Sequence, residues 1–511
     1  MVRRAVAVGQ CRTPEHLGWQ NWRLRRLLLL WASMHLALAL LLLGSPLPDT
    51  SKEYFKGLAR PYAPEVAVSR DGGPVILIVV DAMRPDHLSP YGSARDTTPN
   101  LRALADDGLV LTNYFVNGNW TRPSTATLLT GLPPATHGVE RETDRLADEF
   151  VTLGEILEKA NVPTGAVVGN GNAGSAFGLS RGFNYYADTV KHWKGLPTAE
   201  EVTALAVPYV EAHAHEPFFL MLFFVDPHDP YHAPPPYEDM FVTDPSVPLI
   251  RTPHWEARKY SAAQVTRMKD TYDGALRYTD AALGAFFTAL KRLGVYDKAT
   301  LLVTADHGEA FGEHQAFLHS HHMYDEIVRA PLIIRAPTMS VRGAYNADLF
   351  QTLDLLPSLA AYYGARSTRP LPGVDLFARL GDATLNDPQR AVVCEFNNFG
   401  IHRRSIRTYT HKLVYEAPAD AAEFQATVGN RALLPSVQFS RERWQAFDLA
   451  RDAGEHHDIY SPALAQSPAW RPLVETLKAM PAMRGPRSRV PVAKNVDAET
   501  YRDLKSLGYV Q

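Results

Sequence analysis

Cysteine is scarce in this sequence, which has two among its 511 residues, Cys11 and Cys394. They lie on opposite sides of a long apolar run, so we expect no disulfide between them. The sequence also lacks an excess of charge of one sign, because its formal net charge is -3. Without a basic stripe we expect no nucleic acid partner, and no acidic tail suggests a cationic partner. Its 46% hydrophobic and 21% charged residues are typical of a folded chain with a large core.

One long hydrophobic run stands near the N-terminus, from Leu27 to Leu43. At about 1.5 Å per residue it has the length of a minimal bilayer-spanning helix, and arginines directly precede it. This predicts a single-pass anchor with a cytoplasmic N-terminus and a main body that is periplasmic or extracellular. A cleaved signal peptide, giving a secreted protein, is the alternative, although Leu42, Leu43 and Gly44 do not form a typical cleavage site.

The main body alternates short apolar runs with helical patterns. The apolar runs are VILIVV before Asp81, GAVVG before Asn170, FFLMLFFV before Asp226 and TLLVTA before Asp306. Helical patterns occupy residues 98–108, 153–160 and 272–294. This alternation predicts an α/β fold in which helices flank a mostly parallel sheet, and ligands collect beyond the carboxyl ends of such strands.

The chain divides by composition into four parts. We expect a cytoplasmic N-terminus and membrane anchor over 1–46, a linker over 47–73, a catalytic domain over 74–395, and a smaller C-terminal α+β subdomain over 396–511. The last part is indicated by short segments such as HKLVYE and AFDLARD, which differ from the longer runs before them.

Three segments concentrate polar residues that could carry chemistry. They are VVDAMRPDHLSPYG from Val79, NWTRPSTATLLTG from Asn119 and TADHGEAFGEH from Thr304. Together they resemble the sulfatase family of the alkaline phosphatase superfamily, and the resemblance extends over roughly residues 74–462. It implies an alkaline phosphatase-like fold and a metal-dependent enzyme that acts on sulfuric or phosphoric esters.

The first and third segments supply candidate metal ligands. Asp81 and the pair Asp306 and His307 follow two apolar strands that a parallel sheet can set side by side. Two carboxylates and an imidazole suit a divalent cation, whereas the alternative is that both aspartates cap helices. Sulfatases usually carry a second acidic ligand after the first aspartate, where this chain has Ala82. A shell poorer in oxygen fits zinc or manganese at least as well as calcium.

The second segment resembles the nucleophile region of the sulfatases. That region reads Cys or Ser, any residue, Pro, Ser, Arg, and its first residue is oxidised to formylglycine. Thr121 occupies the first position here and cannot become an aldehyde, because its β-carbon already carries a methyl group. We expect Thr121 to act as the nucleophile and as a ligand of the cation, as in phosphodiesterases and lipid-headgroup phosphotransferases of the superfamily. The alternatives are an N-cap role for Thr121 and attack by Ser124.

The positions that resemble substrate contacts are neutral in this chain. Thr125 stands where the family has arginine, and the family's glycine-lysine-x-histidine signature aligns with residues 169–172, which supply Asn170 and Asn172. Three charged contacts to a sulfate are thus replaced, which favours a different anion or a differently held one.

Two histidines add polar groups near these positions. His228 matches a substrate-contacting histidine of the family, and His319 follows His307 by twelve residues, as in metal-dependent phosphoethanolamine transferases. They could hydrogen-bond the anion, protonate a leaving group or bind a second cation. The alternative for each is an ordinary histidine of a polar loop.

These observations favour an enzyme whose Thr121 forms a covalent intermediate with a phosphoric or sulfuric ester, with phosphoester chemistry preferred. A genuine sulfatase that works without formylglycine is the second hypothesis. The third is a membrane-tethered protein that binds an anionic glycan or lipid without cleaving it. The substrate would be a small-molecule, glycan or lipid-headgroup ester.

Overall fold

The computed structural model describes residues 51–68, 70, 72–188, 196–250, 259–422 and 440–480. None of the helices in these ranges combines the length and the apolar character that a membrane crossing requires. The segment expected to span the membrane, Leu27–Leu43, lies outside the described residues, so the anchor stays a prediction.

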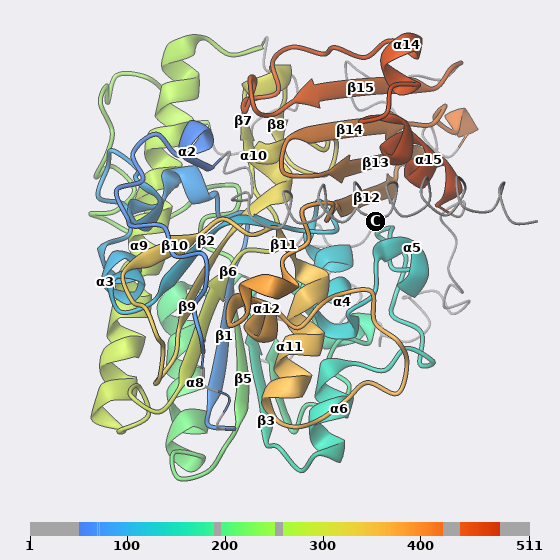
Figure 1. The fold of residues 1–511 in the computed structure, drawn as a ribbon. Coiled ribbons are helices and arrows are strands. Elements are labelled where there is room, and N and C mark those ends of the chain that lie inside the picture. Colours follow the sequence, from blue (N-terminus) through green and yellow to red (C-terminus); the bar gives the residue numbers. More distant parts are fainter. Residues whose placement is uncertain are drawn as a thin grey trace, which may run out of the picture. The chain divides into compact units, whose positions relative to one another are not determined.

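A mixed, mostly parallel sheet of nine strands forms the centre of the described structure (Figure 1). Its order is β10-β2-β9-β6-β1-β5-β3-β4, and β11 pairs with β2 beside this path. The strands are β1 (Val75–Val80), β2 (Leu109–Phe115), β3 (Thr164–Val168), β4 (Tyr185–Asp188), β5 (Phe219–Phe224), β6 (Thr300–Thr304), β9 (Arg329–Arg335), β10 (Ala344–Asn346) and β11 (Phe350–Gln351). Only β9 runs antiparallel to its neighbours in this described sheet.

The four apolar runs of the sequence are the strands β6, β1, β5 and β3, which lie side by side in that order. Every residue in these strands is buried, which explains why their sequences are continuously apolar instead of alternating. Because the four run parallel, their carboxyl ends meet at one edge of the sheet. This arrangement confirms the predicted α/β fold.

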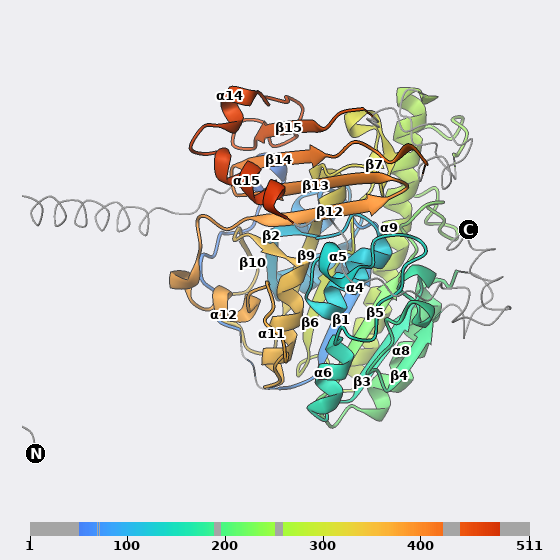
Figure 2. The same ribbon diagram turned by 90° about the vertical axis from the view of Figure 1, so that its right-hand side faces the viewer.

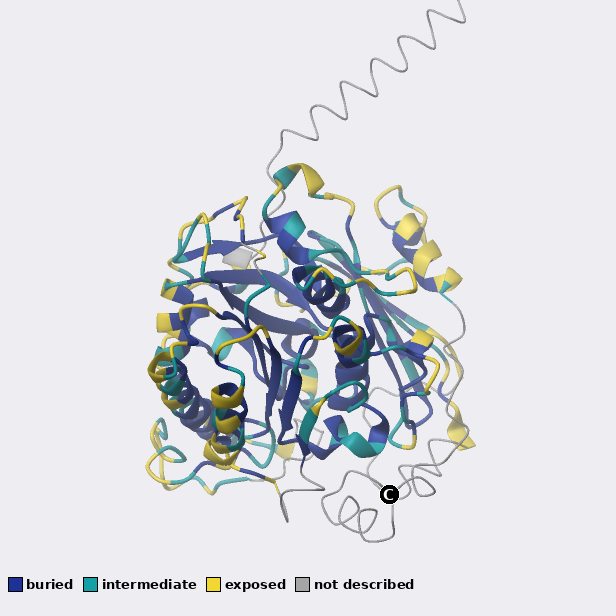
Figure 3. Ribbon diagram, turned by 90° about the horizontal axis from the view of Figure 1, so that it is seen from below, coloured by how far each residue is buried: buried dark blue, intermediate teal, exposed yellow. Residues whose placement is uncertain are grey.

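Helices cover both faces of the sheet (Figure 3). One group packs around α9 and contains α3 (Pro99–Asp106), α8 (Ala199–Ala212) and α9 (Ala262–Arg292). The other contains α4 (Thr121–Thr130), α6 (Leu153–Lys159) and α11 (Leu355–Tyr362). Helix α9 begins earlier than the pattern from Tyr272 predicted, because Ser261 and Gln264 form a capping box at its start.

A second, antiparallel sheet follows along the chain (Figure 2). Its strands are β12 (Val392–Asn398), β13 (Ile401–Arg407), β14 (His411–Glu416) and β15 (Arg443–Asp448), in that order, and the helices α14 (Pro462–Ala465) and α15 (Arg471–Ala479) pack against them. This is the expected C-terminal α+β subdomain. The expected boundary between residues 395 and 396 falls inside β12, and the division into domains stays a prediction.

Shorter elements complete the described structure. They are α2 (Ser51–Tyr54), α5 (Pro134–His137), α10 (Asp325–Val328), α12 (Leu376–Leu380) and the two-stranded pair of β7 (Ala310–Phe311) with β8 (Phe317–Leu318).

A buried ion cluster joins the C-terminal sheet to the start of β9. The ammonium group of Lys412, on β14, is fully buried and lies 2.8 Å from Asp325 Oδ1 and 2.6 Å from Glu455 Oε1. Asp325 also pairs with Arg329 at 2.9 Å and with Arg407 at 3.2 Å. Without Lys412, Asp325 would still pair with two arginines. The main role of Lys412 is therefore to neutralise Glu455.

We predict that Lys412→Met destabilises the protein by about 3–5 kcal/mol, because it leaves a buried carboxylate without its cation. Urea unfolding followed by far-UV circular dichroism measures this change. The exposed Lys298→Met is the control and should change stability by less than about 0.5 kcal/mol. A loss below about 1 kcal/mol for Lys412→Met would show that the cluster tolerates the missing charge.

Candidate active site

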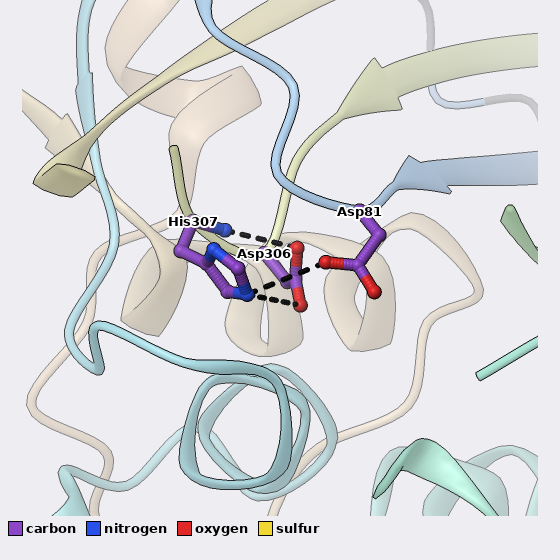
Figure 4. Close-up of side chains that lie close together, drawn as sticks. All are labelled: Asp81, Asp306 and His307. Carbon is purple, nitrogen blue, oxygen red and sulfur yellow. Dashed lines mark hydrogen bonds and ion pairs between the residues drawn. The ribbon is translucent and has the colours of Figure 1, made fainter. Parts of the chain in front are cut away.

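Two neighbouring strands bring Asp81, Asp306 and His307 together at the edge where the carboxyl ends meet (Figure 4). Asp81 directly follows β1, Asp306 comes two residues after β6, and the register of these strands sets Val79 opposite Thr304. His307 Nε2 lies 3.3 Å from Asp81 Oδ1 and 3.4 Å from Asp306 Oδ2. All three residues are buried, and one ligand atom from each lies within 4.8 Å of the others.

The unpaired atoms of this cluster fit a divalent cation. Asp81 Oδ1 and Asp306 Oδ2 are buried oxygens without a hydrogen-bond partner in the described structure. His307 Nδ1 lies 2.8 Å from the carbonyl oxygen of Gly308, so Nδ1 donates its proton there and Nε2 turns a lone pair toward the carboxylates. Burying three electron-pair donors that face one another without a proton raises the free energy of the folded protein. A bound cation removes this penalty.

The histidine cannot neutralise the carboxylates by itself near pH 7. Burial lowers the pKa of His307 to about 4, and the nearby carboxylates only partly oppose this effect. Burial and the charge of Asp306 raise the pKa of Asp81 to about 6, and burial raises the pKa of Asp306 to about 7. The cluster therefore favours either protons or a metal ion, and its donors suit zinc or manganese as well as calcium.

The turn after β1 is held in an uncommon backbone conformation. Ala82, where sulfatases usually have a second acidic residue, has a φ of 54° and is fully buried. Its amide donates to Asp306 Oδ1 at 3.3 Å, and its carbonyl accepts from the Tyr272 hydroxyl at 2.8 Å. The same hydroxyl accepts from the amide of Arg84 at 2.9 Å, so α9 supports the turn that presents Asp81.

Thr121 lies beside this cluster at the start of α4. Its Oγ1 is 3.4 Å from His307 Nε2 and 3.4 Å from Asn170 Nδ2, and Asn170 Nδ2 also donates to Asp81 Oδ2. Trp120 occupies the N-cap position, so the N-cap alternative for Thr121 is wrong. Thr121 is the first helical residue, where the helix dipole favours negative charge on its side-chain oxygen.

The helix-cap alternative for the two aspartates is also wrong. The first helical turn after Asp81 begins at Pro85 and has Arg84 at its N-cap position. Asp306 caps no helix in the described residues. Asp226, which comes two residues after β5 at the same edge of the sheet, does not join the cluster, and its Oδ1 accepts from the amide of Ala199 at the start of α8.

The two hydroxyls that follow Thr121 in α4, those of Ser124 and Thr125, bond to main-chain oxygens. Ser124 Oγ donates to the carbonyl of Asp306 at 2.6 Å, and this bond fastens α4 to the segment after β6. Thr125 Oγ1 donates to the carbonyl of Thr121 at 2.8 Å. Thr121 therefore has the hydroxyl of this trio that faces the carboxylate cluster, while substrate contact by Thr125 stays a prediction.

The two asparagines make different contacts. Asn170 joins the cluster through Asp81 and Thr121, and its Oδ1 accepts from the amide of Asn172 at 2.8 Å. Asn172 Oδ1 accepts from the guanidinium of Arg122 at 2.6 Å. The guanidinium carbon of Arg122 lies 3.5 Å from the centre of the Phe177 ring. Asn172 is thus oriented by a buried arginine, and its contact with substrate stays a prediction.

The structure also gathers the two predicted histidines beside His307. The His319 ring lies 4.1 Å from the His307 ring and 4.9 Å from the His228 ring, measured between centroids. Burial lowers the pKa of His228, but Asp229 and Asp81 outweigh burial and raise it to about 10. Burial, together with the neighbouring histidines, lowers the pKa of His319 well below its usual value. At neutral pH one histidine is therefore charged and the other neutral.

One residue at this site was missed in the sequence, Glu309. It is fully buried, and its Oε1 lies 3.3 Å from Nδ1 of His319. The available signal was its position two residues after His307, within the polar segment from Thr304. The sequence does not tell which of the polar loop residues the Glu309 carboxylate meets.

Comparison with known proteins identifies the family of this chain. The family model described as Sulfatase matches residues 74–365. A multifunctional alkaline phosphatase superfamily protein, PehA of Trinickia caryophylli, is 24% identical over 413 residues, which cover 63% of this chain and 80% of that protein. An ulvan-active sulfatase of Formosa agariphila is 26% identical over 386 residues, covering 68% of this chain and 73% of that protein.

Solved structures share the fold. The phosphonate monoester hydrolase of Agrobacterium radiobacter has a TM-score of 0.63 at 22% identity, covering 80% of this chain and 95% of that one. A protein solved with D-glucosamine-2-N,6-O-disulfate has a TM-score of 0.66 at 17% identity, covering 80% of this chain and 97% of that one. Since the family model spans more than half of its residues, the chain belongs to the sulfatase family of the alkaline phosphatase superfamily.

Proposed function

We propose that this sulfatase-family ester hydrolase attacks a phosphoric or sulfuric ester with Thr121 and forms a covalent intermediate, which water or an acceptor alcohol then resolves. The observation that carries the proposal is the position of Thr121 Oγ1, 3.4 Å from His307 Nε2 and at the edge of the buried carboxylates. A threonine at the nucleophile position excludes the formylglycine chemistry of the family, because it has no route to an aldehyde.

The chain's own residues divide the work of the reaction. A divalent cation held by Asp81, Asp306, His307 and Thr121 would supply Lewis-acid polarisation of the threonine hydroxyl and of the ester. Asn170 donates to Thr121 Oγ1 and so directs its lone pairs, while the start of α4 stabilises negative charge on that oxygen. His228, which is charged at neutral pH, would donate its proton to the departing alcohol oxygen.

Phosphoester chemistry is favoured by the neutral side chains around the nucleophile. The family holds sulfate with charged groups at the positions of Thr125, Asn170 and Asn172. Neutral side chains bind an anion less strongly, which suits the single negative charge of a phosphodiester or phosphonate ester. The similarity to a phosphonate monoester hydrolase and to a multifunctional superfamily member supports this preference. A genuine sulfatase acting without formylglycine is the second candidate, and the similarity to an ulvan-active sulfatase supports it.

A protein that only binds anionic glycans or lipids is disfavoured by the buried, unpaired oxygens of Asp81 and Asp306. Such oxygens are costly unless they hold an ion. We infer a small-molecule, glycan or lipid-headgroup ester as substrate, handled outside the cytoplasm if residues 27–43 anchor the chain in a membrane.

Replacing the nucleophile tests the proposal directly. We predict that Thr121→Ala lowers kcat at least about 10³-fold on the best substrate of a panel of aryl phosphate monoesters, phosphate diesters and sulfates, because the covalent route is lost. Ser124→Ala is the matched control and should retain more than about a tenth of kcat, since its hydroxyl serves a main-chain contact. Full metal-dependent turnover by Thr121→Ala would eliminate the nucleophile assignment.

Removal of the ion tests the metal centre without an activity assay. We predict bound zinc, manganese or calcium in the purified protein, and a thermal midpoint that falls by several degrees on chelation because the ion binds the folded state. Elemental analysis and differential scanning fluorimetry measure both effects. Asp306→Asn should lose the ion and the response to chelator, whereas the exposed Glu211→Gln should keep them. An Asp306→Asn variant that binds as much metal as the parent would disprove this site.

The stabilisation by metal should depend on pH. Without the ion, the raised pKa values of about 6 for Asp81 and about 7 for Asp306 mean that the folded protein holds protons more tightly than the unfolded chain. Their contribution to stability is therefore present at pH 4 and lost as pH rises through about 7. The ion needs both carboxylates deprotonated, so the gain in thermal midpoint on adding it should grow between pH 5 and pH 8. A gain that is constant over this range would contradict the prediction.

A further inference from the structure

Arg122 is a buried cation that directly follows the nucleophile in α4. Its guanidinium group packs on the ring of Phe177, with 3.5 Å between the guanidinium carbon and the ring centre. Nη1 donates to the main-chain carbonyl oxygens of residues 141, 142 and 144, and Nη2 donates to Asn172 Oδ1 at 2.6 Å. These acceptors hold the guanidinium in one place, because each terminal nitrogen is buried and needs a partner.

The contact with Arg122 determines how the side-chain amide of Asn172 is turned. A guanidinium group has donors and no acceptor, so the Asn172 atom that faces it is the oxygen. The NH2 group is then the other arm of the planar amide, and no hydrogen bond joins it to the described residues. Asn172 therefore keeps two N–H donors that the described part of the protein does not use.

The turn that carries Asn172 also orients Asn170. This turn is the short 3-10 helix η3 (Gly171–Ala173), which packs on α4. The main-chain amide of Asn172 donates to Asn170 Oδ1 at 2.8 Å, so Asn170 turns its NH2 group to Asp81 Oδ2 and, at 3.4 Å, to Thr121 Oγ1. A main-chain N–H only donates, so the reversed amide would set donor against donor and oxygen against carboxylate. Donors of the protein thus occupy the oxygens of both side-chain amides.

We propose that Arg122 is a positioning residue that holds the NH2 group of Asn172 for the anionic part of the ester, so that the site recognises the anion with neutral donors. The inference rests on the proposed function, because it concerns how the ester is held while Thr121 attacks. Main-chain oxygens engage the charge of Arg122, so the arginine acts through Asn172 and does not clamp the anion as a direct charged contact would. Such a site suits esters with a single negative charge.

The alternative is that Arg122 only joins α4 to residues 141–144. The variant Asn172→Asp separates the two roles, since the new carboxylate can still accept from Arg122 and gains an ion pair with it. The protein then keeps this anchor, while the NH2 donors are replaced by a negative oxygen that repels an anion. Anchoring alone therefore predicts an unchanged KM for this variant, and the positioning role predicts a raised one.

Steady-state kinetics with bis(4-nitrophenyl) phosphate, a diester with one negative charge, measure the effect. We expect Asn172→Asp to raise KM at least about 30-fold and Asn172→Ala to raise it about tenfold, with kcat within about threefold of the parent, because ground state and transition state lose the same contact. The thermal midpoint of Asn172→Asp should equal or exceed that of the parent. A KM that is unchanged in Asn172→Ala overturns the inference, because the effect of Asn172→Asp would then be repulsion alone.

The arginine is tested by whether its effect passes through Asn172. Arg122→Lys keeps the charge but cannot reach both sets of acceptors, and we expect it to raise KM about tenfold. In the double variant with Asn172→Ala, KM should be no higher than in Asn172→Ala alone, because the two side chains act as a unit. Arg335→Lys, at another buried arginine that donates to main-chain oxygens, is the matched control and should leave KM unchanged. Additive effects of Arg122→Lys and Asn172→Ala on KM would contradict the positioning role.

Binding without turnover distinguishes this inference from the proposed function. In the Thr121→Ala background, isothermal titration calorimetry with bis(4-nitrophenyl) phosphate should show an affinity about tenfold weaker when Asn172→Ala is added. This loss in a protein without Thr121-dependent turnover would leave the roles of Arg122 and Asn172 standing and overturn that of the nucleophile. Turnover that depends on Thr121, with equal affinity in both proteins, would overturn the positioning role alone. A parent protein that neither binds nor cleaves the diester overturns both.

Discussion

The site depends on one electrostatic constraint, the meeting of two unpaired carboxylates with the lone pair of an imidazole inside the protein. Asp81 and Asp306 reach this point because β1 and β6 are adjacent parallel strands. The Gly308 carbonyl holds the proton of His307 on the far nitrogen, so His307 supplies no proton between the three groups. Burial makes this arrangement unfavourable without a cation. The other residues of the site lie around these three side chains.

Contacts from several helices and turns hold the carboxylate cluster in place. Ala82 keeps a left-handed conformation through hydrogen bonds to Asp306 and to Tyr272, a residue of the long helix α9. Ser124 Oγ donates to the carbonyl of Asp306 and so joins α4 to the segment after β6. Catalytic geometry of this kind tolerates little displacement, and three separate elements define it here. The fold is shared with a protein solved with a disulfated glucosamine and with a phosphonate monoester hydrolase, so the fold alone does not define the reaction, and these side chains must.

The sequence was sufficient for four of the nine strands of the described sheet and for the position of the cluster. Apolar runs predicted β1, β3, β5 and β6, and the acidic residues at the ends of β1 and β6 meet as expected. It was insufficient for contacts that depend on side-chain direction. Asn170 and Asp81 are 89 positions apart, and nothing local indicates that their side chains touch. The pairing of Glu309 with His319 depends on how an irregular loop turns back, which hydrophobic periodicity does not encode.

An anomalous-scattering map of crystals grown with zinc or manganese tests the central claim most directly. The account predicts a single strong peak in the cluster, about 2.0–2.2 Å from an oxygen of Asp81, an oxygen of Asp306 and Nε2 of His307, with Thr121 Oγ1 in the same coordination sphere. A peak that excludes these ligands, or a Thr121 oxygen more than about 4 Å from the ion, would contradict it.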